Sequence, residues 1–115
     1  MKLYGIPNCT TVKKARAWLA GHALDFPFHD FKKQGVDAAW LREVVAQTGW
    51  QALVNTRGTT WRKLSDAEKA AVTDETGAIA LMLAQPSVIK RPVLEHAGRY
   101  HLGFAEEQYQ DLFGE

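Results

Sequence analysis

The only cysteine of the chain, Cys9, occupies a position suited to nucleophilic chemistry. A short apolar segment breaks at Gly5 and Pro7, and a helical apolar pattern starts directly after Cys9. Unpaired N–H groups and the positive end of the helix dipole at such a position favour an anion. The thiolate is the nucleophilic form of cysteine, and a helix N-terminus or a nearby cation such as Lys13 lowers the thiol pKa from about 8.5. We therefore predict a reactive Cys9, with a small buried side chain as the alternative.

The segments that flank Cys9 predict a strand-helix-strand unit. Residues 2–5 form the apolar strand, the helix runs from about Thr10 to Gly21, and residues 25–31 alternate apolar and polar side chains. Such a unit implies parallel strands joined by a right-handed crossover. Cys9 then lies beyond the carboxyl end of the first strand, where open α/β sheets bind their ligands.

Residues 32–85 predict a series of helices. Asp37 is a suitable N-cap for one of them, and Ser65 with the glutamate three residues later forms the capping box of another. We interpret these helices as an insertion over about residues 33–86, packed beside the sheet of a single domain that spans residues 1–115.

The end of the chain predicts a hairpin and a last helix. Two short apolar segments, residues 93–95 and 100–104, are separated by turn-forming residues 96–99, and residues 105–113 repeat apolar side chains at helical spacing. Together with the first two strands, this order of elements gives a mixed four-stranded sheet with helices on it. The predicted fold class is therefore α/β, in the thioredoxin-like arrangement.

Composition and charge narrow the class of protein. The chain has 115 residues, of which 46% are hydrophobic, and a formal net charge of +1. This charge gives no reason to expect a surface for nucleic acid or for a membrane. A single cysteine allows neither an internal disulfide nor a cysteine-rich metal site, and the four histidines lack paired spacing. We expect a monomeric cytoplasmic protein without a bound metal.

Three segments of the chain, residues 4–14, 53–58 and 89–93, together resemble motifs of the arsenate reductase and Spx family. The similarity extends over nearly the whole chain, and it is strongest to the YffB-type members, which are proposed to be glutathione-dependent thiol reductases. The resemblance implies a thioredoxin-like fold with a helical insertion, in agreement with the order of elements described above.

The resemblance also implies roles for individual residues. Cys9 matches the nucleophilic cysteine of the family. Arg57 and Arg91 match two arginines that hold the oxyanion beside the sulfur in arsenate reductases, a task suited to a forked and permanently charged guanidinium. Pro92 matches a proline that is cis in thioredoxin-like folds and faces the cysteine. Surface ion pairs for the arginines and a trans bond for the proline are the alternatives.

Three places in the chain depart from the family pattern. Val12 stands where dithiol relatives carry a second cysteine, so an outside thiol must complete any catalytic cycle, and glutathione is the expected co-substrate. Lys13 replaces an arginine, which keeps the charge but loses the forked geometry. Leu102 or Gly103 stands near the place of a third anion-binding arginine, which makes arsenate the less expected substrate.

The predicted activity is that of a monothiol, glutathione-dependent thiol-disulfide reductase that uses Cys9 as nucleophile and has no bound cofactor. Its partners would be glutathione and a mixed-disulfide substrate. Arg57 and Arg91 would hold a glutathione carboxylate, while Asn8 and Thr11 would shape the thiolate site through hydrogen bonds or simply cap the helix. Three alternatives remain: an arsenate reductase that uses glutathione or glutaredoxin, an Spx-like regulator that binds RNA polymerase, and a noncatalytic thioredoxin-like module with a packed cysteine.

Overall fold

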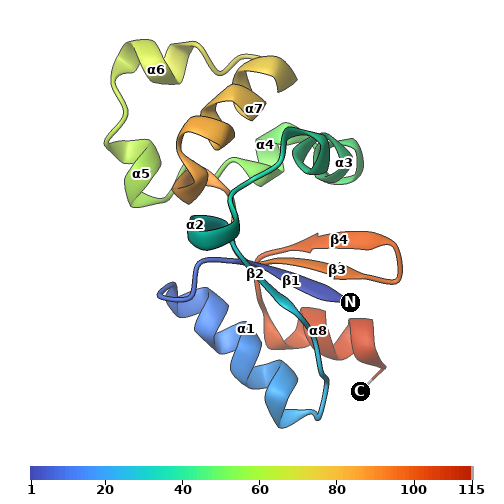
Figure 1. Ribbon diagram of the computed structural model, residues 1–115. Helices are drawn as coiled ribbons and strands as arrows, with labels where there is room; N and C mark the ends of the chain where they lie inside the picture. Colours follow the sequence, from blue (N-terminus) through green and yellow to red (C-terminus); the bar gives the residue numbers. More distant parts are fainter. Residues whose placement is uncertain (115) are drawn as a thin grey trace. The chain divides into compact units, whose positions relative to one another are not determined.

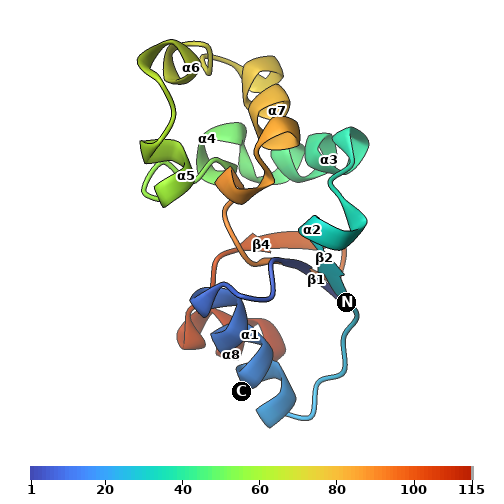
Figure 2. The same ribbon diagram turned by 60° about the vertical axis from the view of Figure 1, so that its left-hand side comes forward.

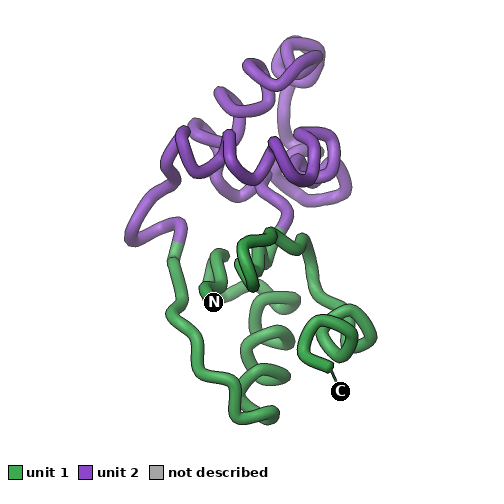
Figure 3. The backbone as a smooth tube through the Cα atoms, turned by 90° about the vertical axis from the view of Figure 1, so that its right-hand side faces the viewer, with its two compact units in different colours: residues 1–30, 91–115 green, residues 31–90 purple. Residues whose placement is uncertain are grey.

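In the computed structural model, which describes residues 1–114, the chain forms two units (Figure 3). The first unit contains residues 1–30 and the C-terminal segment from Arg91, and the second contains Phe31–Lys90. The predicted helical insertion, about residues 33–86, falls within the second unit. That this insertion and the sheet belong to a single domain stays a prediction.

Within the described residues, the first unit contains a mixed four-stranded sheet in the order β2-β1-β3-β4. Its strands are β1 (Lys2–Gly5), β2 (Phe28–Asp30), β3 (Val93–His96) and β4 (Arg99–Leu102). β1 pairs with β2 in parallel and with β3 antiparallel, so that Leu3 lies opposite both Phe28 and Leu94. The predicted parallel unit, the hairpin and the mixed sheet are thereby confirmed.

Helices α1 (Thr10–Gly21) and α8 (Glu106–Phe113) cover one face of this sheet (Figure 1, Figure 2). Their shared core with the strands consists of Leu3, Ala15, Trp18, Leu19, Leu94 and Tyr109. Trp18 and Tyr109 meet edge to face, with ring centroids 5.5 Å apart. Burying one large apolar side chain contributes about 1.5–3 kcal/mol. This core therefore fixes α1 on the sheet, and with it the position of Cys9.

The second strand is shorter than the sequence predicts. The alternating pattern covers residues 25–31, but pairing is limited to Phe28–Asp30, and Phe31 already begins the next helix. Pro27 has no N–H to donate, so it contributes only its carbonyl, which accepts a hydrogen bond from Leu3 N at 3.0 Å. The proline therefore sets the start of the strand.

The hairpin between β3 and β4 turns through two residues, Ala97 and Gly98. Both have positive φ, 53° and 76° respectively, the combination that one of the common two-residue hairpin turns requires. The paired strands therefore extend to His96 and resume at Arg99, so the turn is tighter than the predicted one over residues 96–99.

The second unit is helical, as predicted. Its elements are α2 (Phe31–Gln34), α3 (Ala38–Thr48), α4 (Trp50–Leu53), α5 (Thr59–Arg62), α6 (Asp66–Ala70), α7 (Glu75–Ala84) and the 3-10 helix η1 (Pro86–Val88). Asp37 caps α3 by accepting from Trp40 N at 3.2 Å, and Ser65 and Glu68 form the predicted capping box of α6. The sequence does not predict α4 or α5, because four residues are too few for a helical repeat to be visible. No helix within residues 1–114 is both long enough and apolar enough to cross a membrane.

Candidate active site

Cys9 is the N-cap residue of α1 and follows a turn at the carboxyl end of β1. Its N–H donates to the carbonyl of Ile6 (3.2 Å), and its own carbonyl accepts from Lys13 N (2.9 Å). The backbone at Cys9 is extended, with φ −92° and ψ 129°. The side chain is only partly buried. The thiol therefore lies at the predicted helix N-terminus without being enclosed in the core.

The surroundings of Cys9 lower the pKa of its thiol below the usual range. Partial burial raises the pKa, because it removes water from the charged sulfur. The N–H of Val12, a hydrogen bond and the positive charge from Arg91, and the N–H of Thr11 act in the opposite direction and together outweigh burial. The sulfur forms no capping hydrogen bond of ordinary geometry, so we attribute the effect of these N–H groups to the field of the helix N-terminus.

Arg91 and Pro92 lie in the same unit as Cys9, directly before β3. The peptide bond between them is cis, as the resemblance implies. Pro92 is buried, and its carbonyl accepts from Gly103 N (2.9 Å), which joins this loop to the end of β4. The Arg91 guanidinium is the cation that acts on the Cys9 sulfur. The structure thus brings together two residues that lie far apart in the sequence and that the resemblance pairs.

The position of Cys9 depends on close packing of β1 against α1. This packing in turn depends on Gly5, which the sequence indicates only as the end of a strand. A Cβ added at Gly5 would lie 2.9 Å from one methyl carbon of Val12 and 3.6 Å from the other. The Val12 side chain is fully buried, so the position at which the resemblance implies a second cysteine in dithiol relatives is used here for packing. A glycine between a strand and a cysteine is the signal that could have revealed this contact.

Three further predicted site residues flank Cys9. Asn8 and Lys13 are exposed, and Thr11 is partly buried. Thr11 acts on the sulfur through its backbone N–H, and Arg91 supplies the positive charge that helps lower the thiol pKa against the effect of burial. The predicted contributions of the Asn8 amide, the Thr11 hydroxyl and the Lys13 ammonium stay predictions.

Arg57 belongs to the second unit, where it is exposed in a turn built on Asn55. The side-chain oxygen of Asn55 accepts from Arg57 N (3.2 Å), and Asn55 N donates to the carbonyl of Val88 (2.8 Å). Beside it, Lys90 N donates to the carbonyl of Leu53 (2.7 Å). These bonds join residues 53–58 to residues 88–90 within the second unit, and so connect two of the three segments that carry the family resemblance. The anion-binding role of Arg57 stays a prediction, and Asn55 is a positioning residue that the sequence analysis misses.

Comparison with known proteins agrees with the sequence resemblance. A family model described as the ArsC family matches residues 4–112 of the chain. The global transcriptional regulator Spx of Streptococcus pyogenes is 31% identical over 109 residues, which cover 92% of this chain and 79% of the regulator.

Solved structures extend the comparison to the fold. The structure of a protein named YffB is 53% identical, covers 96% of both chains and has a TM-score of 0.90. An arsenate reductase related protein from Brucella melitensis is 48% identical, covers 98% of this chain and 95% of its own, and has a TM-score of 0.77. The predicted thioredoxin-like α/β fold is confirmed by these neighbours together with the observed sheet.

Proposed function

Because the chain belongs to the ArsC family, we propose that it is a thiol-disulfide oxidoreductase with Cys9 as nucleophile and glutathione as co-substrate. One observation carries this proposal: against the effect of partial burial, the first-turn N–H groups and Arg91 lower the pKa of the Cys9 thiol. The buried Val12 occupies the place of a second thiol. A thiolate with no internal partner needs a small outside thiol, and glutathione supplies one in the cytoplasm, where we expect the protein to act.

The reaction consists of two disulfide exchanges. In the first, the Cys9 thiolate attacks the glutathione sulfur of a mixed disulfide, R–S–S–G. A bond forms between Cys9 and glutathione, the bond to R–S breaks, and R–S⁻ leaves with the electron pair and takes up a proton. In the second, the thiolate of another glutathione attacks the glutathione sulfur held on Cys9, forms oxidised glutathione and releases the Cys9 thiolate. The substrate is reduced to R–SH, and a lowered thiol pKa makes Cys9 a good leaving group in the second exchange.

The arginines are assigned to binding rather than to proton transfer. A guanidinium stays charged at any physiological pH and offers paired donors to a carboxylate. We assign Arg91 to the Cys9 thiolate and to a carboxylate of glutathione, while the anion-binding role that the resemblance implies for Arg57 stays a prediction. Asn8, Thr11 and Lys13 would complete the surroundings of the sulfur.

Mass spectrometry after incubation with oxidised glutathione tests this proposal. We expect one glutathionyl group on the wild-type protein, its removal by free glutathione, and no adduct on Cys9→Ser. The pH dependence of iodoacetamide labelling is the second measurement, and its midpoint should lie below the value of about 8.5 for a free cysteine. An unmodified Cys9 under conditions that modify other thiols of low pKa, or a midpoint at or above that value, would refute the proposal.

Arsenate reduction is a second candidate because a protein 48% identical to the chain is named an arsenate reductase related protein. The Cys9 thiolate would displace an oxygen from arsenic(V), and two glutathione molecules would supply two electrons, giving arsenite and oxidised glutathione. The lack of an arginine at Leu102 or Gly103 is the reason to rank this second. Arsenite production by purified protein with arsenate, glutathione and glutaredoxin would reverse the ranking.

Transcriptional regulation is a third candidate because a relative 31% identical to the chain is a global transcriptional regulator. A redox switch of the simplest kind uses two cysteines that form a disulfide, and the buried Val12 removes that option. A pull-down in which RNA polymerase retains this protein, together with an unreactive Cys9, would favour the regulator over the reductase.

A further inference from the structure

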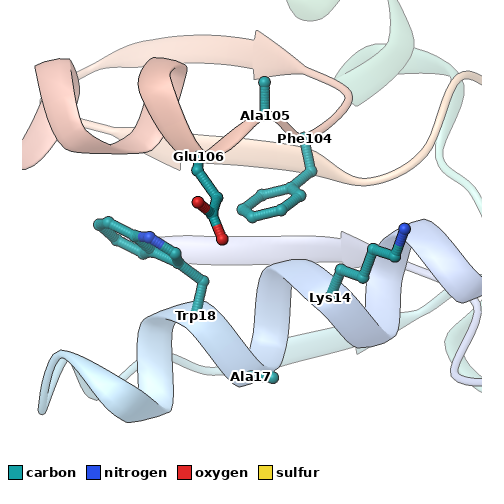
Figure 4. A pocket seen from close by; sticks show the side chains of 6 residues that line it. All are labelled: Lys14, Ala17, Trp18, Phe104, Ala105 and Glu106. Atoms are coloured by element: carbon teal, nitrogen blue, oxygen red, sulfur yellow. The ribbon is translucent and has the colours of Figure 1, made fainter.

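A pocket of about 620 Å³ lies on the first unit, between α1 and the segment that leads from β4 into α8 (Figure 4). Its lining consists of Lys14, Ala17, Trp18, Phe104, Ala105 and Glu106. This volume is within the range of pockets that bind small molecules. None of its lining residues belongs to the site described above, so the pocket is a separate feature of the first unit.

Two aromatic rings form the apolar part of the pocket, and the core holds both of them. Trp18 and Phe104 each meet the ring of Tyr109 edge to face, with centroids 5.5 Å and 4.7 Å apart. Tyr109 is fully buried. The walls of the pocket are therefore fixed by packing before any ligand arrives, which reduces the entropic cost of binding.

Opposite charges complete the pocket. In Figure 4 the carboxylate of Glu106 lies between the rings of Trp18 and Phe104, while the ammonium of Lys14 lies at the other end. Aromatic faces and a carboxylate both attract a cation, and a lysine ammonium attracts a carboxylate. Within residues 1–114, neither Lys14 nor Glu106 is held in an ion pair. Both charges are therefore available to a ligand that carries an ammonium and a carboxylate.

The charged pocket begins close to Cys9 along α1. Lys14 lies five residues after Cys9, which corresponds to about 7.5 Å along the helix axis. An extended peptide covers about 3.3–3.6 Å per residue, so a segment of about two residues matches this separation along the axis. On the other side, Gly103, which precedes Phe104, is hydrogen-bonded to the carbonyl of Pro92 beside Arg91. Lys14 is therefore the end of the pocket that lies nearest to Cys9 along α1, and we expect a ligand that reacts at Cys9 to enter the pocket from there.

We infer that this pocket binds the amino-acid end of a small thiol peptide whose sulfur reacts at Cys9. The ammonium of the ligand lies against Glu106, between Trp18 and Phe104, and its carboxylate lies against Lys14. The inference rests on the proposed function, because the γ-glutamyl end of glutathione carries both an ammonium and a carboxylate. With that end in the pocket, the glycine carboxylate of glutathione is left for Arg91.

Binding of an unreactive analogue tests the inference directly. We would titrate S-methylglutathione into Cys9→Ser protein and follow the NMR signals of the Trp18 indole N–H and the Glu106 amide. Both signals should shift with S-methylglutathione and should not shift with S-methyl-cysteinylglycine, which lacks the γ-glutamyl group. No shift at these positions, or equal shifts with both analogues, would overturn the inference.

Charge variants test which side chains bind the ligand. An exposed charge pair contributes little, so Glu106→Gln and Lys14→Gln should each weaken binding of S-methylglutathione by about two- to fivefold. Lys14→Arg should bind as the wild type does. Glu107→Gln is the matched control, because Glu107 is also exposed in the first turn of α8 but does not line the pocket.

The two proposals fail in different ways. If wild-type protein, Glu106→Gln and Lys14→Gln form the Cys9 adduct with oxidised glutathione at the same rate and bind the analogue equally, the pocket assignment is wrong and the reductase stands. If the analogue binds at the pocket but Cys9 forms no adduct, the reductase is wrong, and of the inference only the binding of the amino-acid end at the pocket stands.

Discussion

A methyl group added at Gly5 should destabilise the protein and disturb the Cys9 site at the same time. A Cβ at this position would lie 2.9 Å from Cγ2 of Val12, whereas nonbonded carbon atoms pack best about 3.5–4.0 Å apart. One of the two groups must therefore move by about 0.6–1.1 Å. Val12 has little freedom to do so, because it is fully buried and a valine in a helix strongly prefers one rotamer.

Overpacking of this kind typically costs about 1–3 kcal/mol. We expect Gly5→Ala to lower the free energy of unfolding by that amount in urea denaturation. The pH midpoint of Cys9 alkylation should change as well, because the N–H groups that counter the effect of burial on the thiol pKa belong to the first turn of α1. Gly21→Ala is the matched control at the other end of α1. A Cβ there meets nothing within 4 Å, and alanine in a helix is more stable than glycine by about 0.5–1 kcal/mol.

Combining Gly5→Ala with Val12→Ala gives the decisive comparison. Val12→Ala alone should destabilise the protein, because it leaves a cavity in the core. In the double variant the added methyl group takes up part of that cavity, so the total loss should be smaller than the sum of the two single losses. Strictly additive losses, or a Gly5→Ala protein as stable as the wild type, would refute the packing argument.

The remaining predictions concern the charge at Cys9 and one buried hydroxyl. Arg91→Met removes a hydrogen bond and a charge that lower the thiol pKa, so the pH midpoint of Cys9 alkylation should rise. The control Arg99→Met changes an exposed arginine and should leave this midpoint unchanged. Equal midpoints for the two variants would contradict the role assigned to Arg91. Because the native thiol pKa lies below the unfolded one, the thiolate contributes stability that is fully present above the unfolded pKa and is lost as the pH falls through the native pKa. The difference in the free energy of unfolding between wild type and Cys9→Ser should therefore shrink on acidification. Urea denaturation at several pH values measures this difference, and a difference that does not change with pH would refute the prediction. The Tyr109 hydroxyl is buried without a hydrogen-bond partner among residues 1–114, so Tyr109→Phe should keep or raise the free energy of unfolding, and a loss above about 1 kcal/mol would contradict that picture.

The order of the elements and the features that depend on neighbouring residues could be predicted from the sequence, whereas the close packing between distant residues could not. The caps at Asp37 and Ser65 are hydrogen bonds that reach three residues along the chain, so local side-chain types are sufficient to predict them. The start of β2 depends on how Pro27 meets the neighbouring strand β1. The alternating pattern already begins at residue 25, before Pro27, so it does not reveal where pairing starts. The element order placed Cys9 at a helix start, but the close approach of Gly5 to α1 depends on how a whole helix packs on the sheet. The cation is a different case, because nothing near Cys9 in the sequence indicates that Arg91 acts on its sulfur, and only the family resemblance predicted it.

Val12 connects the packing of the first unit with its chemistry. Its side chain fills the space that Gly5 leaves open and so fixes the start of α1 against β1. Burial raises the pKa of the Cys9 thiol, and the backbone N–H of Val12 is the largest of the effects that lower it again. The residue thus stabilises a thiolate through its backbone while its side chain, held in the core, offers no second sulfur. In the proposed disulfide exchange, the electrons that complete the reaction then come from another molecule. The proposed reaction therefore needs a recognition site for an outside thiol, and the charged pocket beside Trp18 is the site that we propose for it.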